Sequence, residues 1–181
     1  MTRVGVEAVP DSAFVWMWLP GATEPVVAGR LDLAGEVILF TYGRSYLERA
    51  DAIPVYLPEL PLRPGQIRPG SGLTVAGCIR DAGPDAWGQR VILARHAGHL
   101  DRDADTGDLG LLSYLLESGS DRIGALDFQA SASSYVPREG SASLEEMQTA
   151  ADKLQAGEEL SPDLEAALLR GTSIGGCSSR R

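Results

Sequence analysis

Five prolines stand close together in the first half of the chain, at positions 54, 58, 61, 64 and 69. Because proline has no backbone N–H to donate and restricts the residue before it, neither a long helix nor a central strand fits residues 43–72. We expect an ordered wrap of short pieces there, with seven side chains packed inward: Tyr46, Leu47, Ile53, Tyr56, Leu57, Leu60 and Leu62. The wrap separates two parts of the sequence that follow different hydrophobic patterns.

The part before the wrap has the pattern of short strands. Residues 14–19, 26–33 and 37–42 are apolar or alternating and rich in β-branched and aromatic side chains. Glycine- and proline-containing turn signals separate them. The sequence therefore predicts a small antiparallel sheet, or a partly closed barrel, at the N-terminus.

The part after the wrap changes to a helical period. Pro84 suits a first helical position, Asp85 complements the helix dipole, and Gly98 is expected to end this helix. A second apolar face, residues 111–116, is expected to end at Gly119. Residues 123–128 follow as a predicted strand, and further helices are predicted from Ser143, which opens a capping box, and from Ser161.

These patterns predict an α+β fold, with a β-rich front followed by a mostly helical half. We divide the chain into a β-rich N-terminal subdomain (residues 1–80) and a mainly helical subdomain with one strand (residues 81–170). Residues 171–181 hold a glycine-rich segment and a short tail.

The charge pattern argues against direct binding of nucleic acid. The chain has a net charge of -9, and its 16 basic residues form no cluster that could neutralise phosphates. The longest uncharged apolar stretch, residues 13–20, is far shorter than the roughly 20 residues of a membrane span. Residues 1–10 carry no apolar secretory signal, and the two cysteines lack metal-type spacing, so we expect a cytoplasmic location.

Several residues invite a chemical role that their surroundings do not support. His96 and His99 lie three residues apart, but no further metal ligand fits beside them, and a solvated helix end explains them better. The acidic run at residues 101–108 lacks the turn glycine and the bidentate glutamate of a calcium loop. Asp121 and Arg122 are expected to order a loop through a local ion pair. We therefore predict no metal site and no catalytic residue.

The glycine-rich segment at residues 171–176 is different. Its small residues and bare backbone amides can approach phosphate oxygens and form an anion nest. Alone this is weak evidence, because such stretches usually just end a domain.

Three motifs in this order resemble the HipA-type serine/threonine kinases. They are residues 84–90 (PDAWGQR), residues 119–128 (GSDRIGALDF) and residues 171–176 (GTSIGG), which match the start of that family's glycine-rich loop. The front half of the chain is also similar to the N-terminal region of these kinases.

The resemblance implies the toxin of a bacterial toxin–antitoxin pair. Such kinases use ATP and Mg²⁺ to phosphorylate a protein substrate, an aminoacyl-tRNA synthetase in known cases, and a small helix-turn-helix antitoxin restrains them. The phosphate loop here would be formed by Gly171, Thr172, Ser173, Gly175 and Gly176. Ser173 would be the position of autophosphorylation.

The sequence departs from the family after Gly176. A lysine-bearing strand follows in the family, whereas residues 177–181 of this chain read CSSRR. Phosphoryl transfer needs a lysine on the phosphates, an acid on Mg²⁺ and an acid for the substrate proton, and the family carries these in its C-terminal lobe. Lys153, the single lysine, falls on a predicted surface helix before the loop.

Two interpretations follow. The chain is either the truncated, non-catalytic N-terminal portion of a HipA-like kinase toxin, without a cofactor of its own, or a stand-alone regulatory module that docks on a separate HipA-type kinase lobe. The antitoxin or that lobe would then be its partner, and we expect no phosphoryl transfer by this chain alone.

Overall fold

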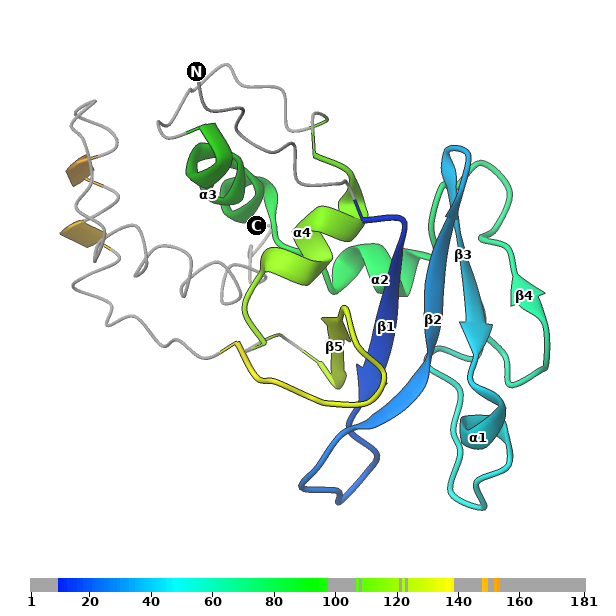
Figure 1. The fold of residues 1–181 in the computed structure, drawn as a ribbon. Helices are drawn as coiled ribbons and strands as arrows, with labels where there is room; N and C mark the ends of the chain where they lie inside the picture. Colours follow the sequence, from blue (N-terminus) through cyan, green and yellow to red (C-terminus); the bar gives the residue numbers. More distant parts are fainter. Residues whose placement is uncertain are drawn as a thin grey trace, which may run out of the picture.

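The computed structural model describes residues 10–97, 107, 109–120, 122, 124–138, 148–149 and 152–153. Five strands and four helices lie in this part of the chain (Figure 1). In chain order they are β1 (Ser12–Met17), β2 (Val26–Ala34), β3 (Val37–Tyr42), α1 (Arg44–Leu47), β4 (Gln66–Ile67), α2 (Gly77–Asp81), α3 (Ala86–Ala97), α4 (Leu111–Glu117) and β5 (Leu126–Gln129).

The strands form one antiparallel sheet in the order β4-β3-β2-β1-β5. The three N-terminal strands confirm the predicted antiparallel sheet. Among the described strands the sheet has two separate edges, β4 and β5, so it is not closed and the expected partial barrel is not confirmed. Strand β5 pairs with β1 although more than a hundred residues separate them in the sequence. The division of the chain at residue 80 stays a prediction.

The middle of the sheet leaves no room for a side chain at position 29. The register of β1 against β2 shifts between Val15 and Trp16, and Gly29 lies opposite Val15. A Cβ atom on Gly29 would lie 2.4 Å from the carbonyl oxygen of Thr41 and 2.6 Å from Cζ of Phe40. The Phe40 ring therefore occupies the space that a side chain at position 29 would need.

Two stacked tyrosines hold the proline-rich wrap against the sheet. The Tyr42 hydroxyl, at the end of β3, donates to the carbonyl of Leu60 and accepts from the amide of Val55. The Tyr46 hydroxyl, in α1, donates to the carbonyl of Ile53 at 2.8 Å, and the two rings stack with centroids 5.8 Å apart. Side chains of β3 and α1 thus satisfy backbone groups of the wrap that the prolines keep out of regular structure.

The predicted inward packing of the wrap is right for four residues and wrong for three. Tyr46 and Leu60 are buried, and Leu47 and Ile53 pack against the core. Tyr56, Leu57 and Leu62 are exposed instead. Residues 56–60 form a turn closed by the Leu60 amide on the carbonyl of Tyr56, and this turn points its first side chains outward.

The helices begin close to where the sequence places them. Helix α3 starts at Ala86, two residues after the expected Pro84, because Asp85 acts as the cap: its Oδ1 accepts from the amide of Gly88 at 2.8 Å. Helix α4 buries Leu112 and Leu115 in the core that also contains β1 and β5 residues. The helices predicted from Ser143 and Ser161 lie outside the described residues, so a mostly helical second half is not confirmed.

The hydrophobic core lies between the sheet, the wrap and α2 and α4. Its largest fully buried side chains include Phe40, Phe128, Leu31 and Ile79. In the described ranges, no helix has the length and apolar character needed to cross a membrane.

Candidate functional site: a buried arginine–aspartate network

The residues predicted to bind phosphate, Gly171, Thr172, Ser173, Gly175 and Gly176, lie outside the described residues, as do His99 and most of the acidic run.

His96 is exposed at the end of α3, and its Nε2 lies 2.8 Å from both carboxylate oxygens of Glu117 in α4. This contact links two helices and agrees with the interpretation of His96 as part of a solvated helix end.

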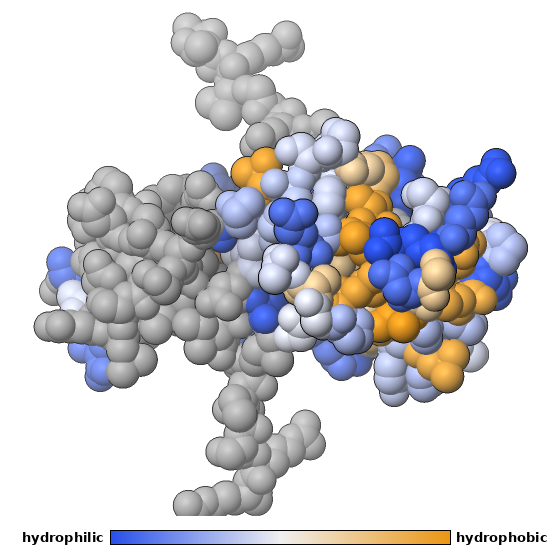
Figure 2. All heavy atoms as spheres, turned by 90° about the horizontal axis from the view of Figure 1, so that it is seen from below, coloured by the Kyte–Doolittle hydropathy of each residue, from blue (hydrophilic) through white to orange (hydrophobic). Residues whose placement is uncertain are grey.

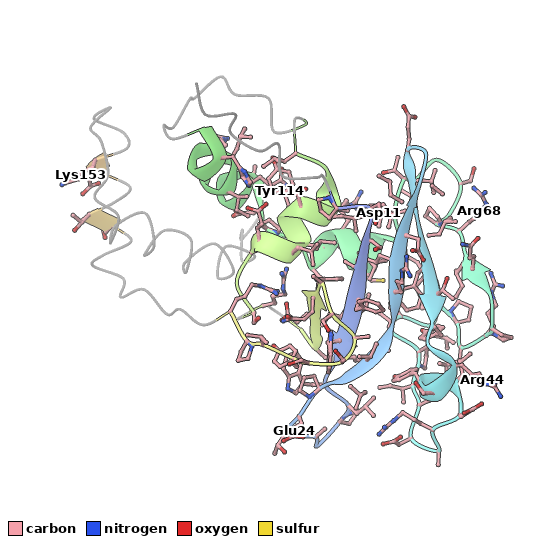
Figure 3. The ribbon with its side chains drawn as sticks, in the orientation of Figure 1. Asp11, Glu24, Arg44, Arg68, Tyr114 and Lys153 are labelled. Carbon is pink, nitrogen blue, oxygen red and sulfur yellow. The ribbon has the colours of Figure 1, made fainter. Side chains whose placement is uncertain are left out.

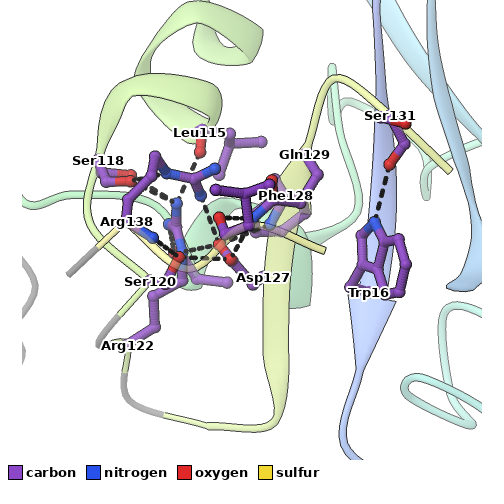
Figure 4. Close-up of polar contacts among 12 residues, drawn as sticks. Trp16, Leu115, Ser118, Ser120, Arg122, Asp127, Phe128, Gln129, Ser131 and Arg138 are labelled. Carbon is purple, nitrogen blue, oxygen red and sulfur yellow. Dashed lines mark hydrogen bonds and ion pairs between the residues drawn. The ribbon is translucent and has the colours of Figure 1, made fainter. Parts of the chain in front are cut away.

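The motif at residues 119–128 contains the most organised polar cluster of the described residues (Figure 4). At its centre is Asp127 in β5, whose side chain is 0% exposed. One carboxylate oxygen accepts from Arg122 and Arg138, and the other accepts from the Ser120 hydroxyl at 2.7 Å and from the Gln129 amide at 2.9 Å. The backbone amide of Phe128, the next residue in the chain, also donates to Asp127 Oδ1 at 2.7 Å. A buried carboxylate surrounded by donors in this way stays ionised.

Arg122 joins three elements to this carboxylate. Its side chain is only 4% exposed, and its Nε lies 3.0 Å from Asp127 Oδ1. The guanidinium also donates to the carbonyl of Ala82 at the end of α2, to the carbonyl of Leu115 in α4 and to the hydroxyl of Ser118. Arg122 is buried and pairs with Asp127, so the expectation that it forms only an exposed pair was wrong. Asp121, its expected partner, lies outside the described residues, so the local pair stays a prediction.

Arg138 approaches Asp127 from the other side. Its Nη2 lies 2.6 Å from Asp127 Oδ1, and its Nε donates to the carbonyl of Ser118 at 2.8 Å. The side chain is 26% exposed. The main chain of Arg138 also bonds to Ser120, through its amide to the Ser120 hydroxyl and through its carbonyl to the Ser120 amide. Ser118, Ser120, Arg122 and Arg138 are therefore held together around one carboxylate.

The electrostatics of the network follow from this geometry. Burial alone raises the pKa of Asp127, but the Ser120 hydrogen bond, the charges of Arg138 and Arg122 and the Phe128 amide outweigh it and hold that pKa below its ordinary value. Burial lowers the pKa of Arg122 while the charge of Asp127 opposes this shift. Because arginine is a very strong base, Arg122 remains charged at neutral pH despite this lowering of its pKa.

The network is suited to hold the fold together. Within the residues that the structure describes, every buried side-chain nitrogen and oxygen has a hydrogen-bond partner. In the same residues, no group of three or more His, Cys, Asp and Glu side chains could hold a metal ion. Sequence reasoning missed this site because its hydrogen bonds join residues up to 40 positions apart.

A second polar contact fixes the start of α2. The Glu59 carboxylate, in the wrap, accepts from the amides of Gly77 and Cys78 at 3.1 and 3.0 Å. These hydrogen bonds, that of Cys78 first, lower the pKa of Glu59. Burial and the neighbouring Glu59 raise the pKa of the Cys78 thiol to about 12. Cys78 is therefore a protonated thiol at neutral pH and no nucleophile.

Three large apolar side chains of the wrap are exposed at the surface of the described part. We call Tyr56, Leu57 and Leu62 the wrap patch; Leu57 is 65% exposed. Seen from below, hydrophobic atoms reach the surface over the part of the molecule that contains the sheet and α1 (Figure 2). Charged side chains such as Glu24, Arg44 and Arg68 lie at the periphery (Figure 3), away from the buried network. Exposed apolar side chains that gather in one segment are typical of a surface that meets another protein.

Comparison with known proteins adds one finding. A family model described as the HipA N-terminal domain matches residues 22–129. This range begins before β2 and ends with β5, so it includes four of the five strands and the Asp127 network, with the exception of Arg138. No curated protein matches the chain.

Proposed function

Because the chain belongs to the HipA N-terminal domain family, we propose that its 181 residues form the N-terminal, non-catalytic portion of a HipA-like serine/threonine protein kinase of a toxin–antitoxin system. The family match over residues 22–129 carries this proposal. The network around Asp127 supports it, because it gives a structural role to the motif at residues 119–128 on which the resemblance rests.

The glycine-rich segment remains a proposal from the sequence. We propose that Gly171, Thr172, Ser173, Gly175 and Gly176 correspond to the start of the kinase phosphate loop, with Ser173 at the position of autophosphorylation. The described residues do not fit a magnesium–nucleotide site, since no group of three metal-binding side chains occurs among them. Lys153, the only lysine in the sequence, lies away from the sheet at the periphery (Figure 3). We therefore derive no transfer step for this chain.

Titration with Mg-ATP tests the non-catalytic assignment. A ligand that binds only the folded state raises the melting temperature as its concentration increases. At 100 times its Kd it adds about 2.7 kcal/mol to the free energy of unfolding. We expect no saturable rise in the melting temperature of the purified chain. A saturable rise would show that these residues already form a nucleotide site and would overturn the assignment.

A second candidate function is favoured by the wrap patch. In this alternative the chain is a regulatory module that docks on a separate HipA-type kinase lobe through Tyr56, Leu57 and Leu62. Burying such side chains contributes about 1.5–3 kcal/mol each when they are fully covered. The patch is also compatible with the first proposal, in which the lobe it covers belongs to the same protein. A helix-turn-helix antitoxin is the other proposed partner, and the cytoplasmic location stays a prediction from the cysteine pattern.

Co-purification of this chain with a HipA-type kinase lobe that lacks its own N-terminal domain tests the docking surface. We expect Leu57→Asp to abolish the complex without changing the melting temperature, because the side chain is exposed. Leu33→Asp is the matched control, since Leu33 is also an exposed leucine (44%) but lies in β2, outside the wrap. The wrap patch would be ruled out as the contact if the kinase lobe retained the wild type and both variants equally. It would also be ruled out if both variants failed to co-purify with the lobe.

A further inference from the structure

The two arginines that share Asp127 are embedded differently. Arg122 is almost fully buried, contacts α2 and α4 through backbone carbonyls, and places its guanidinium carbon 5.1 Å from the centroid of the Phe128 ring. Arg138 is about a quarter exposed, and its side chain reaches Asp127 and the carbonyl of Ser118. Arg122 is thus part of the core, whereas Arg138 contacts Asp127 from the surface.

Arg138 ends a segment that crosses the face of β1 without forming a helix or strand. We call residues 131–138 the strap. Its carbonyl at Ser131 accepts from Trp16 Nε1 at 3.0 Å, and its carbonyl at Val136 accepts from the side chain of Gln129. Most strap side chains are exposed. A segment with few buried apolar contacts and an exposed backbone belongs to the least stable parts of a fold.

The strap covers two tryptophans. The ring of Tyr135 lies 5.4 Å from that of Trp16 and, in an edge-on arrangement, 5.3 Å from that of Trp18, centroid to centroid. Aromatic contacts of this kind contribute about 0.5–1.5 kcal/mol beyond the buried area. Tyr135 is the large apolar contact between the strap and β1, and its hydroxyl also interacts with Ser120 and Asp127. The strap therefore covers this aromatic face next to the point where Arg138 holds its end on the same carboxylate.

We infer that Arg138 is a latch for the strap. When Arg138 leaves Asp127, residues 131–138 release from Ser120 and uncover Trp16 and Trp18, while Arg122 keeps β5, α2 and α4 together on the same carboxylate. The inference concerns the described residues alone and goes beyond the proposed function, because it needs neither a nucleotide nor a partner. It gives the fold a local opening in which an apolar aromatic surface is covered or exposed, and the Arg138–Asp127 ion pair is the charged contact that holds the closed form.

Amide hydrogen exchange measured residue by residue tests the latch on the full chain. The amides of Arg138 and Ser120 are the probes, since each donates a hydrogen bond across the closed strap. In Arg138→Gln we expect both to exchange at least tenfold faster, while amides of β2 and β3 keep their wild-type rates. Arg44→Gln is the control: it removes an exposed pair with Glu48 and should leave all of these rates unchanged.

A second readout follows the aromatic face. In a Trp87→Phe background the remaining tryptophans are Trp16 and Trp18, and acrylamide should quench their fluorescence more strongly in Arg138→Gln than in the parent. Arg122→Gln should instead accelerate exchange throughout the sheet or prevent folding. Three results would overturn the inference. The probe amides could exchange at wild-type rates in Arg138→Gln, or the amides of β2 and β3 could exchange faster by the same factor as the probes. The third is that Arg122→Gln accelerates exchange in the strap alone.

Discussion

Replacing Asp127 by asparagine is the sharpest test of what holds this fold together. The substitution keeps the size of the side chain but removes its charge, and it leaves Arg122 with an uncompensated guanidinium that is 4% exposed. An asparagine also presents two donor hydrogens where the aspartate accepts from Ser120 and Gln129. Breaking one side of a buried ion pair costs about 3–5 kcal/mol.

A loss of this size is a large part of the 5–15 kcal/mol that stabilises a typical domain. For a chain of this length it lowers the melting temperature by about 6–20 °C, at 2–4 °C per kcal/mol. Urea unfolding followed by tryptophan fluorescence, extrapolated linearly to water, gives the free energy of unfolding directly.

The matched control is Asp32→Asn. Asp32 pairs with Arg30 at 2.6 Å on the surface of β2, with half of the arginine side chain exposed. An exposed pair contributes less than about 1 kcal/mol. If Asp127→Asn loses no more stability than Asp32→Asn, the buried network does not organise the fold and our reasoning about residues 118–138 is refuted.

Four further predictions follow from the same structure. Lowering the pH through the depressed pKa of Asp127 should reduce the free energy of unfolding. The contribution of the ionised carboxylate is complete above the ordinary aspartate pKa near 3.9 and is lost as the pH falls through the lower pKa of the folded state. This loss should be missing from the pH profile of Asp127→Asn. Gly29→Ala should destabilise the protein by about 1–3 kcal/mol in urea unfolding, because its Cβ would collide with Thr41 and Phe40, whereas Gly110→Ala, with open space around it, should not collide. Tyr42→Phe should cost about 1–3 kcal/mol, because it leaves the amide of Val55 and the carbonyl of Leu60 without their partner, and a Tyr56→Phe variant with wild-type stability serves as its comparison. In a Cys177→Ser variant, Cys78 should react with iodoacetamide far more slowly in the folded state at pH 8 than in urea, since its pKa is raised to about 12; equal rates would contradict the assigned environment.

Local patterns predicted the strands of the front half to within two residues. Strand β1 covers residues 12–17, whereas residues 14–19 were expected. Residues 37–42 form β3 as expected, and β2 extends one residue beyond the predicted range. The strand expected at residues 123–128 exists as β5, at residues 126–129. Its pairing with β1 could not be derived, because hydrophobic alternation identifies a strand but not its neighbour.

The errors have a common physical origin in contacts between distant residues. Helix α2 was not predicted because its first amides are satisfied by Glu59, a residue of the wrap, and no local cap marks its start. Arg122 was assigned to a weak local pair because burial by α2 and α4 cannot be read from its neighbours in sequence. In the wrap, the turn at residues 56–60 decides which side chains face outward, and the proline pattern predicts only that regular structure stops.

The family resemblance and the residue-level reasoning contributed different things. The motifs pointed to HipA-type kinases, and the match over residues 22–129 confirms an N-terminal domain of that kind. The structure then accounts for the motif at residues 119–128 as a buried network, which the motif alone does not explain. The phosphate loop at residues 171–176 stays a prediction from the sequence.

The most direct test of the central proposal is transfer of labelled phosphate from γ-labelled ATP by the purified chain. The reaction should contain Mg²⁺, the chain free of other proteins, and a HipA-type kinase with its catalytic lobe as the positive control. We predict no label above background on the chain itself or on an added aminoacyl-tRNA synthetase, while the control is labelled. Label above background on either protein would contradict a non-catalytic role for these 181 residues.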